Sequence, residues 1–141
     1  MVLRTAKILI LPFLMSFCLL TSCEDLYMVD CSECTFTEPT SCLLRIELGE
    51  TYNRGVPYEI TIYRGTIEDG IVIFNQNIYT NFTYTVSINS EYTVTASVEE
   101  NGKEYVAVDA TTPRTRRIED VCEETCYIVV DNTVDLEIKY Y

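Results

Sequence analysis

Cysteine is the residue type in this chain that offers the most chemistry. Seven cysteines occur in 141 residues, and four of them form two closely spaced pairs, Cys31-x₂-Cys34 and Cys122-x₃-Cys126. Four thiolates at such spacings can hold a zinc ion, and the same four residues can instead form two disulfides or stay as free thiols. The disulfides can be local, within each pair, or can join one pair to the other. The spacing alone leaves these alternatives open.

A fifth cysteine, Cys23, ends a segment with the layout of an export signal. Arg4 and Lys7 begin it, an apolar run occupies residues 8–20, and the run leads into Leu20-Thr21-Ser22-Cys23. The order apolar, small, small, cysteine resembles the cleavage site of a bacterial lipoprotein signal. This resemblance implies cleavage before Cys23 and acyl chains such as palmitate on the new N-terminal cysteine.

The alternative for residues 8–20 is a transmembrane helix. Its thirteen residues would rise only about 20 Å as a helix, against about 30 Å of hydrocarbon. Charged Glu24 and Asp25 follow almost at once. We therefore expect a cleaved signal peptide at residues 1–22. Two or more acyl chains hold a protein firmly on a bilayer, so the membrane is the expected partner of Cys23.

The acidic pair Glu24-Asp25 refines the expected location. Directly after a lipid-bearing cysteine, it resembles the export signal of surface lipoproteins in Bacteroides-like bacteria. In enterobacteria an acidic residue at this point can instead mean retention in the inner membrane. We expect the outer membrane, with the protein facing the cell exterior.

Export favours disulfides for the four paired cysteines. Secreted proteins pass through an oxidising compartment, where Cys31, Cys34, Cys122 and Cys126 would pair rather than bind zinc. No metal is therefore expected. A thioredoxin-like redox motif is disfavoured, because the first pair lies in a polar segment and opens no recognisable helix. Of the two other cysteines, Cys18 lies in the expected signal peptide, and Cys42 is expected to be a small buried apolar residue.

Composition excludes several classes of function. The net charge is −12, and loss of the signal would leave eight basic and 22 acidic residues, a net charge of −14. Such a surface repels nucleic acid. The chain has no histidine, which removes the usual general base, histidine-containing triads and most catalytic zinc sites. A carboxylate pair remains chemically open, but no pattern marks one, so we expect neither an enzyme nor a cofactor.

The mature chain divides near residue 42. Residues 23–41 are polar and acidic and lack periodicity, so we expect a lipidated tether there. Between residues 42 and 141, apolar and polar residues alternate with the period of a β-strand. The expected strands are centred on residues 44–48, 58–63, 71–74, 82–88, 92–98, 105–110, 127–130 and 134–140.

This pattern predicts an all-β domain. About seven or eight short strands separated by turns indicate an antiparallel β-sandwich, either immunoglobulin-like or prealbumin-like, in which each sheet buries one face. Asn101-Gly102 and Asp131-Asn132 are predicted hairpin turns. A loop is expected to carry Arg114, Arg116 and Arg117, which balance nearby acidic residues.

Eleven tyrosines raise the question of a carbohydrate platform. Four of them fall on the apolar face of their strands and are expected in the core: Tyr58, Tyr84, Tyr92 and Tyr140. Five are expected to be exposed: Tyr63, Tyr79, Tyr105, Tyr127 and Tyr141. Among these, Tyr63, Tyr105 and Tyr127 are the candidate ligand-binding residues.

Several stretches together resemble small Bacteroides-type outer-membrane surface lipoproteins. They are the lipid cysteine, CSEC, EPT, YEITIYRG, YTVTASVEENGKEYVAVD and the C-x₃-C-Y motif before LEIKYY. The resemblance covers nearly the whole mature chain and implies location and fold, but no activity. The prealbumin fold also occurs in hydroxyisourate hydrolases, which use histidines and a C-terminal Tyr-Arg-Gly-Ser. This chain has neither, so that activity is not expected.

The expected function follows from the anchor and the absence of a reactive constellation. We expect a non-catalytic surface lipoprotein that binds another outer-membrane or surface protein, as an accessory module of an uptake or adhesion complex. The alternative is a glycan- or cation-binding module that uses exposed tyrosines or carboxylates.

Overall fold

The computed structural model describes residues 29–49, 55–119 and 121–138. The predicted signal peptide (residues 1–22), Cys23 and the last two tyrosines, Tyr140 and Tyr141, lie outside these ranges. Contacts divide the chain into two units, Met1–Asp30 and Cys31–Tyr141, and the elements below belong to the second. Within the described ranges, no helix is long and apolar enough to cross a membrane.

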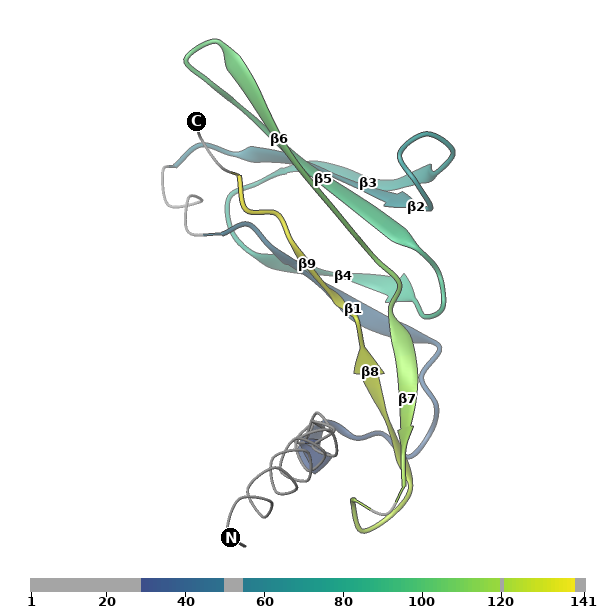
Figure 1. Ribbon diagram of the computed structural model, residues 1–141. Coiled ribbons are helices and arrows are strands. Elements are labelled where there is room, and N and C mark those ends of the chain that lie inside the picture. Colours follow the sequence, from purple (N-terminus) through teal and green to yellow (C-terminus); the bar gives the residue numbers. More distant parts are fainter. Residues whose placement is uncertain (1–28, 50–54, 120, 139–141) are drawn as a thin grey trace, which may run out of the picture. The chain divides into compact units, whose positions relative to one another are not determined.

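The described part of the second unit is built from strands and a single short 3₁₀ turn (Figure 1). In chain order the elements are η1 (Cys31–Glu33), β1 (Ser41–Glu47), β2 (Tyr58–Arg64), β3 (Ile71–Ile78), β4 (Phe82–Ser87), β5 (Tyr92–Glu100), β6 (Lys103–Thr111), β7 (Arg114–Ile118), β8 (Cys126–Val130) and β9 (Thr133–Asp135).

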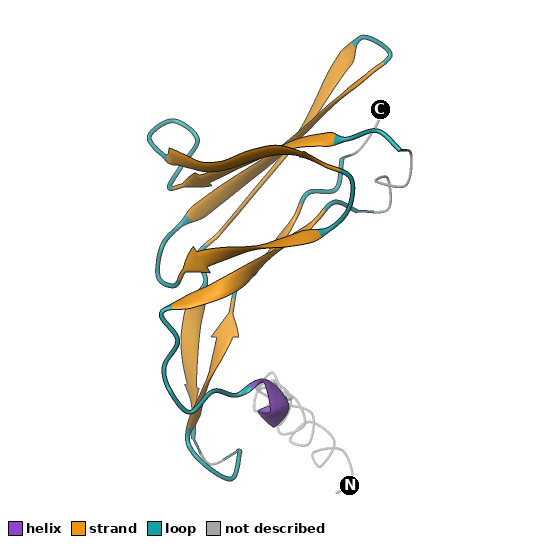
Figure 2. Ribbon diagram, turned by 180° about the vertical axis from the view of Figure 1, so that it is seen from behind, coloured by secondary structure: helices purple, strands orange, loops and turns teal. Residues whose placement is uncertain are grey.

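The strands form two facing sheets and a separate ribbon (Figure 2). One sheet has the order β4-β1-β9, the other has the order β3-β2-β5-β6, and β7 pairs with β8 alone. All neighbours are antiparallel except β1 and β9, which are parallel. The predicted antiparallel β-sandwich is therefore confirmed.

Strand order separates the two topologies expected for this sandwich. In an immunoglobulin domain, the first, second, fourth and fifth strands share one sheet. Here β1 pairs with β4 and β9, whereas β2 pairs with β3 and β5 in the opposite sheet. This order differs from the immunoglobulin arrangement.

The core forms where the alternating apolar residues of the two sheets face each other. Because successive side chains of a strand point to opposite faces, the core residues of β1, β2 and β5 fall at every second position. The buried core residues are Leu44, Ile46, Leu48, Tyr58, Ile60, Ile62, Val86, Tyr92, Val94, Ala96, Val98, Val134, Leu136 and Ile138. Tyr84 is half-buried and packs against them. Tyr58 and Tyr92 thus lie in the core, as expected.

The two predicted hairpin turns have different outcomes. Asn101 and Gly102 join β5 to β6 with φ angles of 54° and 73°, and two consecutive positive values are what a tight hairpin turn requires. Asp131-Asn132 does not form a hairpin, because β8 pairs with β7 whereas β9 pairs with β1. Only Asp131 has a positive φ, 57°.

The Asp131-Asn132 step instead transfers the chain from the ribbon to the sandwich. The Asn132 carbonyl oxygen accepts the Arg45 N–H at 2.8 Å, and the Asn132 amide donates to the Leu43 carbonyl oxygen at 3.0 Å. Both contacts fix the chain beside β1. The residues that follow Asn132 therefore run parallel to β1. In a hairpin they would instead run antiparallel to β8.

The arginine-rich segment is a strand, and its prediction as a loop is wrong. Arg114, Arg116 and Arg117 lie in β7, which pairs with β8 from Arg114 opposite Val130 to Ile118 opposite Cys126. All three arginines are exposed. Because β7 lies in a two-stranded ribbon rather than over the core, most of its residues meet solvent and no apolar alternation marks the strand.

Tyr92 connects β4 and β5 through a buried hydroxyl group. The side chain is fully buried, its hydroxyl accepts the Ser87 N–H at 3.0 Å, and it donates to the Ser87 carbonyl oxygen at 3.2 Å. Removal of the hydroxyl therefore leaves two backbone groups without their partner.

We expect Tyr92→Phe to lower the free energy of unfolding by about 1 kcal/mol, because two partly buried hydrogen bonds to the Ser87 backbone are lost. Urea denaturation followed by circular dichroism measures the change. Tyr79→Phe is the matched control, since Tyr79 is 55% exposed, and its midpoint should not move. Equal stability of the two variants would contradict the assigned role of the Tyr92 hydroxyl.

Candidate functional site

Two separate segments bring the four paired cysteines together. Cys31 opens η1 and Cys34 follows it, with the Cys34 N–H donating to the Cys31 carbonyl oxygen at 3.4 Å. In a 3₁₀ turn, residues three apart lie on the same side. Cys122 lies in the β7–β8 connection, and Cys126 is the first residue of β8.

The cysteines form two disulfides that join one pair to the other. Cys31 bonds Cys122 with an S–S distance of 2.09 Å and a Cα–Cα distance of 5.8 Å. Cys34 bonds Cys126 with an S–S distance of 2.18 Å and a Cα–Cα distance of 5.5 Å. Both Cα separations fall in the usual range for disulfides. In this state all four sulfurs are bonded, so none is a thiolate that could ligate zinc.

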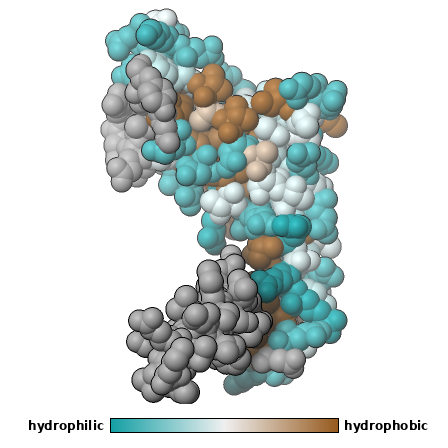
Figure 3. All heavy atoms as spheres, viewed as in Figure 1, coloured by the Kyte–Doolittle hydropathy of each residue, from teal (hydrophilic) through white to brown (hydrophobic). Residues whose placement is uncertain are grey.

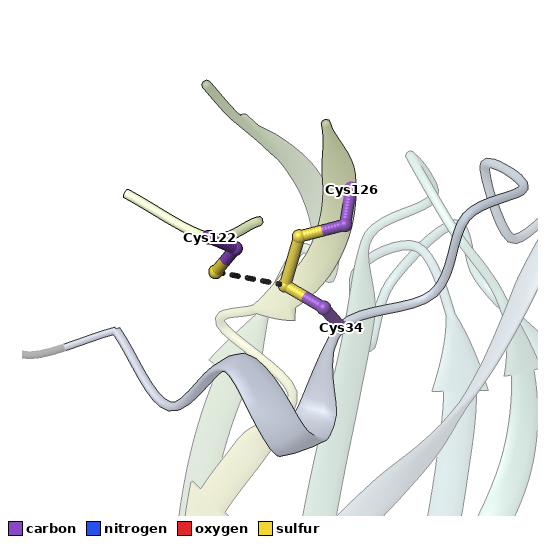
Figure 4. Close-up of side chains that lie close together, drawn as sticks. All are labelled: Cys34, Cys122 and Cys126. Carbon is purple, nitrogen blue, oxygen red and sulfur yellow. Dashed lines mark hydrogen bonds between the residues drawn. A yellow bond between two sulfur atoms is a disulfide. The ribbon is translucent and has the colours of Figure 1, made fainter. Parts of the chain in front are cut away.

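The two bridges lie against each other. The sulfur of Cys122 is 3.9 Å from the sulfur of Cys34, as Figure 4 shows beside the Cys34–Cys126 bond. The sulfurs of Cys34, Cys122 and Cys126 all lie within 4.8 Å of one another. The side chain of Cys126 is 1% exposed, whereas Cys31 is exposed to solvent.

Hydrogen bonds reinforce the attachment of this segment to the ribbon. The Thr35 N–H donates to the Tyr127 carbonyl oxygen at 2.9 Å, and the Tyr127 N–H donates to the Thr35 carbonyl oxygen at 2.8 Å. The Thr115 hydroxyl donates to Glu38 Oε1 at 2.7 Å. Residues 31–38 of the expected tether are thus held against β7 and β8, and β1 begins at Ser41.

An open hollow of about 610 Å³ adjoins the disulfides. Phe36 and Val121 line it with side chains that are 71% and 63% exposed. Glu123 and Glu124 also line it, and both are exposed. The approach to the bridges therefore combines an apolar surface with negative charge.

Cys42 lies outside this cluster and is the free cysteine of the described residues. It is half-buried on the core-facing side of β1, close to its expected role as a small buried apolar residue. Burial raises the pKa of its thiol, because a thiolate loses hydration there. The neutral thiol is thus the form present at neutral pH.

We expect iodoacetamide to alkylate Cys42 more slowly in the folded protein than in urea, because the thiolate is the reacting form. The alkylation rate should rise with pH. The pH at which it is half-maximal should be higher for the folded protein than for the unfolded chain, because burial raises the pKa of the thiol. Mass spectrometry of quenched time points measures both rates. Equal profiles in the two states would contradict the assigned burial effect.

The candidate tyrosines do not form one binding surface. Tyr63 lies on the outer side of β2, next to Thr93 of β5. Tyr105 of β6 packs against the core, and Tyr127 lies on β8 in the ribbon. All three are half-buried, whereas the sequence predicted exposed side chains. A shared sugar platform of these three residues is therefore not present in the described fold.

The arginines of β7 have acidic neighbours. The Arg114 side chain forms an ion pair with Asp131, with its Nε at 3.0 Å from Asp131 Oδ2. The Arg117 Nε lies 2.9 Å from Glu119 Oε1. These pairs agree with the expectation that the cluster balances nearby acidic residues.

No sequence pattern predicted the hydrogen bonds that surround the disulfides. Thr35, Glu38 and Thr115 are ordinary polar residues with no distinctive spacing, and their contacts depend on how β8 pairs with β7. Only the cysteines pointed to this region. Comparison of the chain with known protein families, curated proteins and solved structures finds no match.

Proposed function

We propose that this chain is the precursor of a lipoprotein anchored through Cys23 in the outer membrane and facing the cell exterior. Its β-sandwich would be a non-catalytic module that binds another surface protein in an uptake or adhesion complex. Residues 1–22 would be the signal peptide. We also propose that the chain belongs to the small Bacteroides-type surface lipoproteins that its sequence resembles.

The sequence Leu20-Thr21-Ser22-Cys23, after a short basic and apolar segment, is the observation that carries this proposal. Short apolar segments with small residues before the cleavage point are typical of export signals. The two disulfides are consistent with it, since such bonds persist in oxidising compartments. The lack of histidine favours a binding role over catalysis.

The β6 strand is the surface that we propose for the protein partner. It is an edge strand, and Val106 and Val108 on its outer side are 56% and 53% exposed. An exposed edge strand with apolar side chains favours association. The face seen in Figure 3 is mainly hydrophilic, with a group of apolar side chains in its upper half.

A paired substitution tests this assignment on intact cells. We expect a Val106→Asp/Val108→Asp variant to lose a stoichiometric cross-linked partner that the wild-type protein retains, while it still reaches the membrane. Thr83→Asp/Thr85→Asp adds the same charge on the exposed side of β4, the edge strand of the other sheet, and should keep the partner. Absence of any partner for the wild-type protein would reject the protein-binding proposal.

A cation- or glycan-binding module is the second candidate. The observation that favours a cation is an open hollow of about 460 Å³ lined by Glu59, Glu99 and Glu104, since carboxylates are the ligands that Ca²⁺ prefers. Isothermal titration of the purified domain with Ca²⁺ and with a glycan panel distinguishes this candidate. If neither titration gives measurable heat of binding, this second candidate is rejected.

A further inference from the structure

The contact between the two disulfides has a chemical consequence. Thiol–disulfide exchange proceeds when a thiolate reaches a sulfur of a disulfide. The Cys122 sulfur lies 3.9 Å from the Cys34 sulfur, so it is already next to the bond that it would attack. We propose that the four cysteines form one thiol–disulfide exchange site, which an external thiol enters through the Cys31–Cys122 bond.

Burial determines which bond reacts first. In the first bond, Cys31 is exposed and Cys122 is half-buried. In the second bond, Cys34 is also half-buried, but Cys126 is only 1% exposed. The open hollow of about 610 Å³ borders all four cysteines, and it provides the approach for a small reagent. An external thiolate therefore reaches the Cys31 sulfur before it reaches the buried sulfur of Cys126.

The first step consumes a two-electron thiol reductant. The external thiolate attacks the Cys31 sulfur, forms a mixed disulfide and releases the Cys122 thiolate. A second external thiolate then attacks the external sulfur of the mixed disulfide. Cys31 leaves as a thiolate and takes a proton, and the reductant is oxidised to its own disulfide. Cys31 and Cys122 are then both reduced.

The second step needs no further reagent. The Cys122 thiolate attacks the Cys34 sulfur and forms a Cys34–Cys122 bond. The Cys34–Cys126 bond breaks, and its electron pair leaves on Cys126, which takes up a proton. In either product Cys34 stays bonded to the ribbon, so the attachment of residues 34–38 survives the loss of one bridge.

Charge at the entrance selects the class of thiol. Glu33, Glu123 and Glu124 are exposed beside the cysteines, and they repel an anionic reagent. A cationic thiol should therefore react fastest per thiolate, followed by an uncharged one and then by a thiol that carries a carboxylate. High salt should reduce these differences, because the acidic groups are exposed and screened.

Peptide mapping after partial reduction tests the exchange. The folded protein receives one equivalent of dithiothreitol, is trapped with N-ethylmaleimide at low pH and is digested with a protease that cuts after glutamate. Cleavage after Glu33 and after Glu123 or Glu124 separates all four cysteines. We expect a Cys34–Cys122 linked peptide together with labelled Cys126, at an exchange equilibrium within about tenfold of unity.

Variants make the result unambiguous. In the Cys31→Ser variant, Cys122 is a free thiol even without a reductant. Because exchange would move the free thiol between Cys122 and Cys126, both should be partly labelled. The Cys34→Ser/Cys126→Ser variant has no second bond, so apart from the free Cys42 only Cys31 and Cys122 should be labelled. Label confined to Cys122 in Cys31→Ser, with no Cys34–Cys122 peptide in the wild type, would overturn the exchange site.

The order of thiols is measured separately. Cysteamine, 2-mercaptoethanol and mercaptoacetate are compared by the rate at which each opens the Cys31–Cys122 bond, per thiolate present. Rates that fall in this order at low salt and become similar at 1 M salt support the proposed selection by the acidic residues at the entrance. Equal rates at low salt would reject the selectivity.

Discussion

A Cys23→Ser variant is expected to incorporate no labelled palmitate and to move from the membrane fraction to the soluble fraction. Acyl chains contribute about 0.8 kcal/mol for each buried CH₂, and two or more chains hold a protein durably on a bilayer. The proposed anchor is the acylated Cys23, so exchange of its sulfur for oxygen removes the site of modification. Metabolic labelling and fractionation of cells measure the effect.

Cys42→Ser is the matched control for this experiment. It also exchanges sulfur for oxygen, but at the cysteine that is free within the described residues, so label and membrane association should remain. The mass of the N-terminal peptide separates lipidation from simple secretion, because both involve cleavage but only lipidation adds acyl chains. A soluble, unlabelled wild-type protein would refute the proposed anchor.

Much of the sandwich could be predicted because one face of each sheet is buried. Leu44 and Ile46 lie two positions apart in β1, and Val94 belongs to the same kind of alternation in β5. All three are fully buried, as a two-residue period requires. The turn at Asn101-Gly102 was equally visible, because few residues adopt two successive positive φ angles. Local chemistry therefore determined these elements.

Strand partners could not be predicted, because alternation says which face of a strand is buried and not which strand lies beside it. The segment after Asp131 alternates like a hairpin strand, yet it joins β1 through contacts with Arg45 and Leu43. Those contacts depend on residues almost ninety positions away. Long-range pairing of this kind leaves no mark in a local pattern.

The β6 strand shows a second limit of hydropathy patterns. Its most apolar residues, Val106 and Val108, face solvent, whereas Ala107 packs against the core. Asp109 shares the side of Ala107, and its carboxylate accepts the Asp135 N–H of β9 at 2.8 Å. This bond links the two sheets. A rule that places valine inside would therefore assign the wrong face to β6.

At the cysteine site, residue types could be predicted but connectivity could not. An exported chain with two close pairs favours disulfides, and the structure contains them. Four cysteines allow three pairings, however, and sequence spacing does not choose among them. The choice comes from η1 and from the Thr35–Tyr127 hydrogen bonds, which place one pair beside the other.

Loss of both disulfides should destabilise the domain far more than loss of either one. The bridges join residues 91 and 92 positions apart, and each closes a loop that contains β1 to β7. In the chain-entropy model, the first closure of a loop of this length contributes about 4–5 kcal/mol. Once it is made, the other bridge closes only a short loop of about eight residues, which contributes about 2–3 kcal/mol.

The two bridges should therefore be redundant. Cys31→Ser/Cys122→Ser and Cys34→Ser/Cys126→Ser should each lose about 2–3 kcal/mol, because the remaining bond still closes the long loop, whereas the fourfold variant should lose about 7 kcal/mol. Guanidinium denaturation measures all three, with Cys42→Ser as the control that retains both bonds. The expected loss of the fourfold variant exceeds the sum of the losses of the two double variants. If the losses were additive instead, the two bridges would constrain separate parts of the fold and not the same loop.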